Sequence, residues 1–147
     1  MRVNELMTRN PACVTPQQSI QDAAAEMERC DCGCLPVVEQ GAGGRLVGVV
    51  TDRDIAMRAV GKGRDANTKV ADVMTASPKC CCDDDDIGLV QRIMAEQQVR
   101  RVPVVNHAGH TVGMISQADL ARAAQSRALE ELDMAHIVEK VSQPTVH

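Results

Sequence analysis

Two short polar motifs are the residues of this chain whose types and spacing best suit ligand binding. They are Thr51-x-x-Asp54 and Ser116-x-x-Asp119, and each follows an apolar run and precedes a helical pattern. A hydroxyl and a carboxylate at this spacing form a capping box at a helix start, and spacing alone favours that structural role. The same junction also suits an anion, because free N–H groups and the helix dipole attract phosphate.

A second group of residues capable of metal binding or redox chemistry consists of seven cysteines: Cys13, Cys30, Cys32, Cys34, Cys80, Cys81 and Cys82. Their spacing lacks the Cys-x₂-Cys pair that is typical of structural zinc sites. We interpret Cys30 and Cys81 as small buried hydrophobic residues.

A run of four carboxylates, Asp83 to Asp86, directly follows the triple cysteine. Such a run offers ligands for a divalent cation, but it is more typical of a solvated helix N-terminus, where the dipole favours negative charge. His107 and His110 flank Gly109 at a predicted hairpin turn, and we interpret both as exposed loop residues.

The elements that must position these residues form a tandem repeat. Leu6-Met7-Thr8 recurs as Val73-Met74-Thr75, and the segment 34–38 recurs as 101–105, both at an offset of 67 residues. The segment 48–55 recurs as 113–120, at an offset of 65 residues, and the difference falls in a Gly-rich loop that tolerates a change of length. We therefore divide the chain into repeat 1 (residues 1–67), repeat 2 (68–126) and a tail (127–147).

Each repeat predicts the same order of elements, a βαββα-type unit, and the pair predicts an α+β fold. Ser19 and Asp86 hold equivalent positions at the start of the first helix of each unit. The expected segments are extended 12–15 and 79–82, helices 20–29 and 87–98, strands 35–38, 46–50, 102–105 and 112–115, and helices 54–60 and 119–124. In the tail, Leu129, Leu132, Ile137 and Val141 predict an extra amphipathic helix that packs on the module or on a second copy.

Composition excludes several classes of protein. The chain has no aromatic residue and a formal net charge of −4, so it lacks the stacking platforms and basic face of a nucleic-acid binder. No apolar run reaches the roughly 18 residues of a membrane span, and no signal-peptide pattern opens the chain, so we expect a cytoplasmic protein without membrane contact. No nucleotide-hydrolysing loop or nucleophile–base pair is apparent, so we expect no enzyme.

The repeated combination resembles a CBS-domain pair, or Bateman module, of the stand-alone type. A Gly-x-x-[Thr/Ser]-x-x-Asp motif after the second strand, with an x-Pro-Val-Val strand about a dozen residues earlier, occurs twice, and the resemblance covers about residues 3–125. It implies two repeats packed sheet to sheet about a pseudo-twofold axis, and a homodimer of such pairs. It also implies two clefts for adenosyl ligands such as AMP, ADP, ATP or S-adenosylmethionine, in which the Asp binds ribose and the Thr or Ser binds phosphate.

The resemblance assigns residues from both repeats to each cleft. The first site would contain Thr51, Arg53, Asp54, Lys79, Cys80, Arg100 and Arg101. The second site would contain Ala12, Cys13, Val14, Gly33, Cys34, Ser116 and Asp119. Because the first site gathers arginines and the second has no basic residue in the matching positions, we expect the first to bind a nucleotide better.

The expected function is therefore regulatory: the chain senses an adenine nucleotide and signals by a change in its packing or in its contacts with an unidentified regulated protein. Two alternatives stay open. One is a redox- or zinc-responsive protein that uses the same fold but senses through Cys13 and Cys34. The other is a partner-binding module whose clefts are empty.

Overall fold

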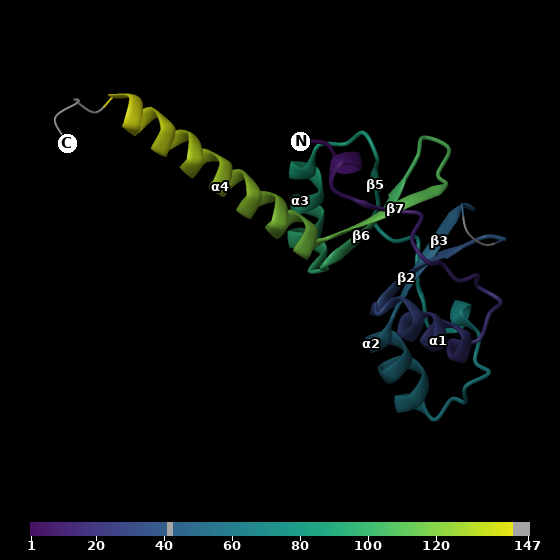
Figure 1. Cartoon of the computed structure of the whole chain (residues 1–147). Helices are drawn as coiled ribbons and strands as arrows, with labels where there is room; N and C mark the ends of the chain where they lie inside the picture. The colour runs from purple at the N-terminus through teal and green to yellow at the C-terminus, as the bar shows by residue number, and fades with distance from the viewer. Residues whose placement is uncertain (41–42, 143–147) are drawn as a thin grey trace.

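The computed structural model describes residues 1–40 and 43–142, with the side chains of residues 133 and 135–142 left out. Two sheets and their helices form two similar units, which confirms the α+β fold of tandem repeats (Figure 1). One sheet has the order β2-β3-β4 and the other the order β1-β7-β6-β5. The strands are β1 (Thr8–Arg9), β2 (Cys34–Val38), β3 (Leu46–Thr51), β4 (Thr75–Ala76), β5 (Cys81–Cys82), β6 (Arg101–Val105) and β7 (Thr111–Ser116).

The first helix of each unit forms as its capping residues predict. Ser19 caps α1 (Ile20–Cys30) with a reciprocal capping box to Asp22, and Asp86 caps α3 (Ile87–Gln97) by accepting from the Gly88 N–H. Each helix lies on the apolar hairpin that follows it, β2–β3 or β6–β7, and buries one face there. The two cores consist of aliphatic, Met, Ala and Cys side chains.

The leading segment of each repeat belongs to the sheet of the other repeat, an exchange that the sequence analysis did not predict. β1 pairs antiparallel with β7, and β4 pairs antiparallel with β3. Residues just before these strands are exchanged as well. Val3 and Met7 lie in the core of the second unit, and Val70 and Val73 lie in the core of the first. The exchange joins the two units through their cores as well as through their hairpins, whose tips are linked by the Thr111 N–H to the Gly44 carbonyl at 3.0 Å.

Two equivalent glycines allow the exchanged segments to approach. A Cβ atom added at Gly113 would lie 2.6 Å from the Met7 sulfur and 3.0 Å from the Thr8 carbonyl oxygen. A Cβ atom at Gly48 would lie 2.7 Å from the Met74 sulfur and 2.9 Å from the Thr75 carbonyl oxygen. The near identity of the two environments shows that the repeats are related by an approximate twofold axis, and it explains why both repeats carry glycine at this position of the strand.

The second helix differs between the repeats. In the first repeat it continues from α2 (Asp52–Asp54) through a π-helical turn (η2, Ile55–Ala59) and a 3₁₀ turn (η3, Val60–Lys62). In the second repeat a single helix, α4 (Gln117–Ser142), runs 26 residues without a break. The predicted C-terminal helix is therefore confirmed, but it continues the helix predicted at 119–124 and is not a separate element. Figure 1 shows its C-terminal part projecting away from both units.

The predicted packing of the tail helix on the module is wrong for the described side chains, whereas its packing on a second copy stays a prediction. Leu129 and Leu132 are each 56% exposed. Ile137 and Val141 lie outside the residues whose side chains are described. Across the described ranges, no helix combines the length and the apolar character needed to cross a membrane.

The exchange generates a prediction for stability. Gly113→Ala should lower the free energy of unfolding by about 1–3 kcal/mol, because the new methyl group meets backbone as well as the Met7 side chain and the strand must shift. Urea unfolding of the two proteins measures the difference. An unchanged midpoint for Gly113→Ala would contradict the close approach of β1 to β7.

Candidate functional site

Both strand-to-helix junctions form the capping boxes that their spacing predicts. The Thr51 hydroxyl accepts from the Asp54 N–H at 3.1 Å, and the Asp54 carboxylate accepts from the Thr51 N–H at 3.0 Å. The corresponding distances at Ser116 and Asp119 are 3.1 and 2.8 Å. Each Asp uses Oδ2 for its cap, so the other carboxylate oxygen distinguishes the two junctions.

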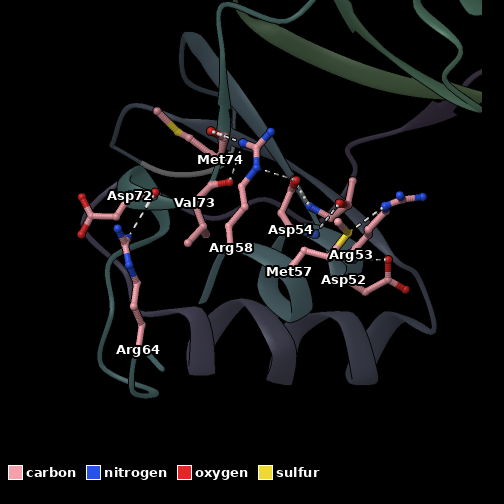
Figure 2. Close-up of polar contacts among 10 residues, drawn as sticks. Asp52, Arg53, Asp54, Met57, Arg58, Arg64, Asp72, Val73 and Met74 are labelled. Carbon is pink, nitrogen blue, oxygen red and sulfur yellow. Dashed lines mark hydrogen bonds and ion pairs between the residues drawn. The ribbon is translucent and has the colours of Figure 1, made fainter. Parts of the chain in front are cut away.

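At the first junction, arginines bind to nearby protein groups (Figure 2). The Arg58 Nε lies 3.7 Å from Asp54 Oδ1, and the same guanidinium donates to the Val73 carbonyl at 3.2 Å and the Met74 carbonyl at 3.4 Å. Arg58 thereby links the junction to the chain that leads into β4. Arg53 lies along its own helix, with Nε 3.1 Å from the Met57 sulfur.

At the second junction, a cavity of about 340 Å³ is lined by both units. Its lining contains Ser116 and Asp119, the charged residues Asp31, Arg101 and Arg122, and several apolar side chains. The full lining is Thr8, Pro11, Ala12, Cys30, Asp31, Cys32, Cys34, Leu35, Arg101, Met114, Ser116, Ala118, Asp119 and Arg122. Asp119 is only 9% exposed, and its Oδ1 forms an ion pair with the Arg122 guanidinium.

Two arginines, Arg101 and Arg122, line the cavity at the second junction. Neither occupies a position that matches an arginine of the first predicted site, so the comparison of matching positions did not reveal them. Arg101 is the cross-strand partner of Ser116 in the β6–β7 ladder, so its backbone lies beside the strand-to-helix junction of its own repeat. Arg122 lies one helical turn beyond Asp119, a position outside the segments that the sequence analysis compared. The spacing of three residues between Asp119 and Arg122 could have predicted this contact, because residues three apart lie on the same face of a helix.

The difference between the clefts has a simple steric cause. Ala118 holds the place that Arg53 holds in the first repeat, and Arg122 holds the place of Met57. In the first repeat the Arg53 and Met57 side chains contact each other beside the junction. In the second repeat the small Ala118 side chain leaves the space beside Asp119 as part of the cavity.

The structure brings some residues of the second predicted site together and separates others. Ala12, Cys34, Ser116 and Asp119 line the cavity. Gly33 lines a neighbouring cavity of about 500 Å³, and Arg101 lines both this cavity and the one beside Ser116 and Asp119. The Cys13 thiol donates to the Pro11 carbonyl at 3.2 Å. The Val14 side chain lies in the core of the first unit.

The residues of the first predicted site are more dispersed. Thr51 and Asp54 form their capping box, as described above. Arg100 and Arg101 line a shallow cavity of about 420 Å³ together with Ser116 and Gln117, so they lie beside the junction of the second repeat. Lys79 and Cys80 are exposed on the segment that precedes β5.

The cysteines differ from the expectations in part. Cys81 is buried, as predicted. Cys30 is exposed and forms a disulfide with Cys32, so the prediction of a buried hydrophobic residue is wrong. Its place at the exposed C-terminal end of α1 explains the difference.

Cys13 and Cys34 are free thiols with different surroundings. Burial raises the pKa of each to about 11, with a further increase from Glu26 for Cys13. For Cys34, Arg101 partly offsets burial, and Asp54 and Asp52 reinforce it. Their predicted pairing stays a prediction.

The raised pKa of Cys34 predicts slow alkylation. At pH 8 a thiol with a pKa of about 11 is ionised in about one molecule in a thousand, and the thiolate is the reacting form. The rate of iodoacetamide modification at Cys34, followed by mass spectrometry of its peptide, should therefore keep rising tenfold per pH unit up to about pH 10. A rate that levels off near pH 9 would contradict the burial of this thiol.

The comparisons with known proteins agree with the fold. The CBS domain family matches residues 3–61 and 70–126, and the chain belongs to this family. CBS domain-containing protein YhcV of Bacillus subtilis is 40% identical over 124 residues, which cover 81% of this chain and 82% of the relative. Hypoxic response protein 1 of Mycobacterium tuberculosis is 33% identical over 126 residues, covering 85% of this chain and 86% of the relative.

Solved structures of CBS-domain pairs are similar as well. A structure of Hypoxic Response Protein I with two coordinated zinc ions has a TM-score of 0.76 and 31% identity, and covers 83% of this chain and 98% of its own. A CBS domain protein of Pyrobaculum aerophilum in complex with AMP has a TM-score of 0.75 and 29% identity, and covers 82% of this chain and 90% of its own.

Proposed function

We propose that this chain is a regulatory module that binds an adenine mononucleotide, with AMP as the first candidate, in the cavity beside Ser116 and Asp119. The observation that carries the proposal is the meeting of a strand-to-helix junction, two arginines and an apolar wall in one cavity formed by both units. An AMP-bound relative of the same fold supports the choice of ligand class.

Each part of a nucleotide has a partner of suitable chemistry in this cavity. The Asp119 carboxylate keeps acceptor capacity for ribose hydroxyls beyond its contact with the Ser116 N–H. The Arg101 and Arg122 guanidinium groups suit a phosphate, and the start of the long helix α4 adds a favourable dipole. Ala12, Leu35 and Met114 form an aliphatic surface for the base, since the chain has no aromatic ring to stack on it.

The size of the cavity favours a mononucleotide. Its volume of about 340 Å³ lies at the lower end of the range for small-molecule sites, roughly 300–1,000 Å³. Because Arg101, Arg122 and Asp119 line one cavity, whereas the residues of the first predicted site are dispersed, our proposal favours the second junction. The opposite expectation from the sequence, that the first site binds a nucleotide better, stays a prediction.

Signalling follows from the position of α4. The helix begins at Gln117, contains Asp119 and Arg122, and projects from the module. A ligand that competes for Asp119 changes the Asp119–Arg122 ion pair and with it the first turns of α4. In this proposal the exposed part of α4 carries the change to a second copy of the chain or to a regulated protein.

The alternative function uses the thiols of the same cavity. Cys30, Cys32 and Cys34 all line it, and a related structure contains two zinc ions. A redox change at the disulfide or a soft metal at reduced thiols would then be the signal. Metal analysis and thiol titration of the unmodified chain and of Cys34→Ser test this function, which requires zinc or a blocked thiol that Cys34→Ser loses; zinc that Cys34→Ser retains is bound elsewhere.

Calorimetric titration with AMP tests the proposal. Asp119→Asn keeps an amide that can cap the helix but loses the charged acceptor for the ribose hydroxyls. We expect AMP affinity to fall by about tenfold to a hundredfold, which corresponds to about 1.4–2.7 kcal/mol.

The matched control is Asp54→Asn, the same change at the equivalent position of the first repeat. It should leave AMP affinity within about threefold of the unmodified chain. A loss confined to Asp54→Asn would place the nucleotide at the first junction and contradict the proposal. Failure of the unmodified chain to bind AMP, ADP or ATP would instead favour a partner-binding module with empty clefts.

A further inference from the structure

A cluster of metal-binding side chains lies outside the proposed nucleotide cavity, at the β5 edge of the second sheet. The Cys82 thiol, an Asp84 carboxylate oxygen and a His107 ring nitrogen all lie within 4.8 Å of one another. The three residues come from two segments that are distant in the sequence: the end of β5 with the loop after it, and the β6–β7 hairpin. From the sequence alone, the acidic run and His107 are predicted to be separate solvent-exposed features.

The fold holds these two segments side by side. β5 pairs with β6 in parallel, with Cys82 opposite Val105, and the Asp83 N–H donates to the Val105 carbonyl at 3.1 Å. His107 follows Val105 by two residues. Its hairpin is held by the Asn106 side chain, which accepts from the Ala108 and His110 N–H groups at 3.0 Å each. The position of His107 over the acidic loop is therefore set by backbone pairing.

The acidic loop is fixed from its other side as well. The Cys82 N–H donates to Asp85 Oδ2 at 2.8 Å, which closes the turn after β5. Arg2 donates to the Asp84 carbonyl at 3.0 Å, and the Asn4 N–H donates to the Asp83 carbonyl at 2.9 Å. These contacts hold the loop backbone, while the side chains of Asp84 and His107 remain 44% and 77% exposed. Small rotations can therefore bring the ligand atoms together without repacking the core.

The ligand types select the kind of metal. A thiolate, an imidazole and a carboxylate form a mixed S, N, O set that suits Zn²⁺, with a fourth position open to water. Mg²⁺ and Ca²⁺ prefer oxygen ligands alone, so the thiol disfavours them. Asp83, Asp85 and Asp86 surround the cluster in the chain and add negative charge that attracts a dication.

We propose that Cys82, Asp84 and His107 form a binding site for one zinc-class divalent cation, separate from the nucleotide cavity and from Cys13 and Cys34. His107 Nε2 lies 3.0 Å from Asp84 Oδ2, and the cation takes the position between these two atoms, which become its ligands. On binding, the Cys82 thiol also releases its proton to solvent. The metal then links the β5 loop to the β6–β7 hairpin and stabilises this edge of the second sheet.

Titration of the reduced chain with Co²⁺, a spectroscopic substitute for Zn²⁺, tests the site. Coordination by Cys82 should produce a thiolate-to-cobalt charge-transfer band, which is easily observed because the chain has no aromatic residue. Cys82→Ser and His107→Gln should each lose one equivalent of tightly bound Co²⁺ or weaken its binding at least tenfold. Zn²⁺ should displace Co²⁺ from the unmodified chain.

Two matched controls use neighbouring residues of the same types. Cys80→Ser and His110→Gln remove an exposed thiol and the other hairpin histidine, and both should keep the stoichiometry and the band of the unmodified chain. Equal binding by Cys82→Ser, His107→Gln and the two controls would overturn the proposal and leave His107–Asp84 as an ion pair only. AMP affinity should be unchanged in Cys82→Ser, so that failure of the metal site and failure of the nucleotide site are distinguishable.

Discussion

The pairing of β1 with β7 and of β4 with β3 is the interaction on which the rest of the structure depends. Each repeat is too small to bury its own sheet and core comfortably, and it completes both with a segment supplied by the other repeat. The backbone pairing requires glycine at two equivalent positions, and it covers strand edges that would otherwise be exposed. The two units are thereby joined, and the cavity beside Ser116 and Asp119 takes its lining from both of them.

The helix-capping role of the strand-to-helix junctions does not exclude the binding role that we propose for the second one. At both junctions one carboxylate oxygen caps the helix, while the second oxygen has an arginine nearby. The arginine is held differently in the two cases. Arg58 also binds carbonyl groups that lead into β4, whereas Arg122 lines the open cavity. The two copies of the motif therefore have different surroundings because a few neighbouring positions differ.

The order of helices and strands could be predicted from the sequence, because apolar spacing and capping residues act locally. Ser19, Asp86 and the two Thr/Ser-x-x-Asp motifs all cap helices as expected. The exchange of leading segments could not be predicted from the sequence, because a short strand such as Thr8–Arg9 carries no information about the strand with which it pairs. The role of Arg122 was not predicted for a related reason: it lies one helical turn beyond the motif, and only the geometry of the helix brings it to Asp119. The Cys82–Asp84–His107 cluster likewise depends on the β5–β6 pairing, which brings together residues more than 20 positions apart.

A crystal structure of the chain with AMP would locate the nucleotide. We expect the ribose hydroxyls to contact the Asp119 carboxylate, Arg101 or Arg122 to bind the phosphate, and the base to lie against Leu35 and Met114. The first junction should keep its Arg53–Met57 contact in the same crystal. Nucleotide density beside Thr51 and Asp54 alone, with an empty cavity at Asp119 under saturating AMP, would contradict the account.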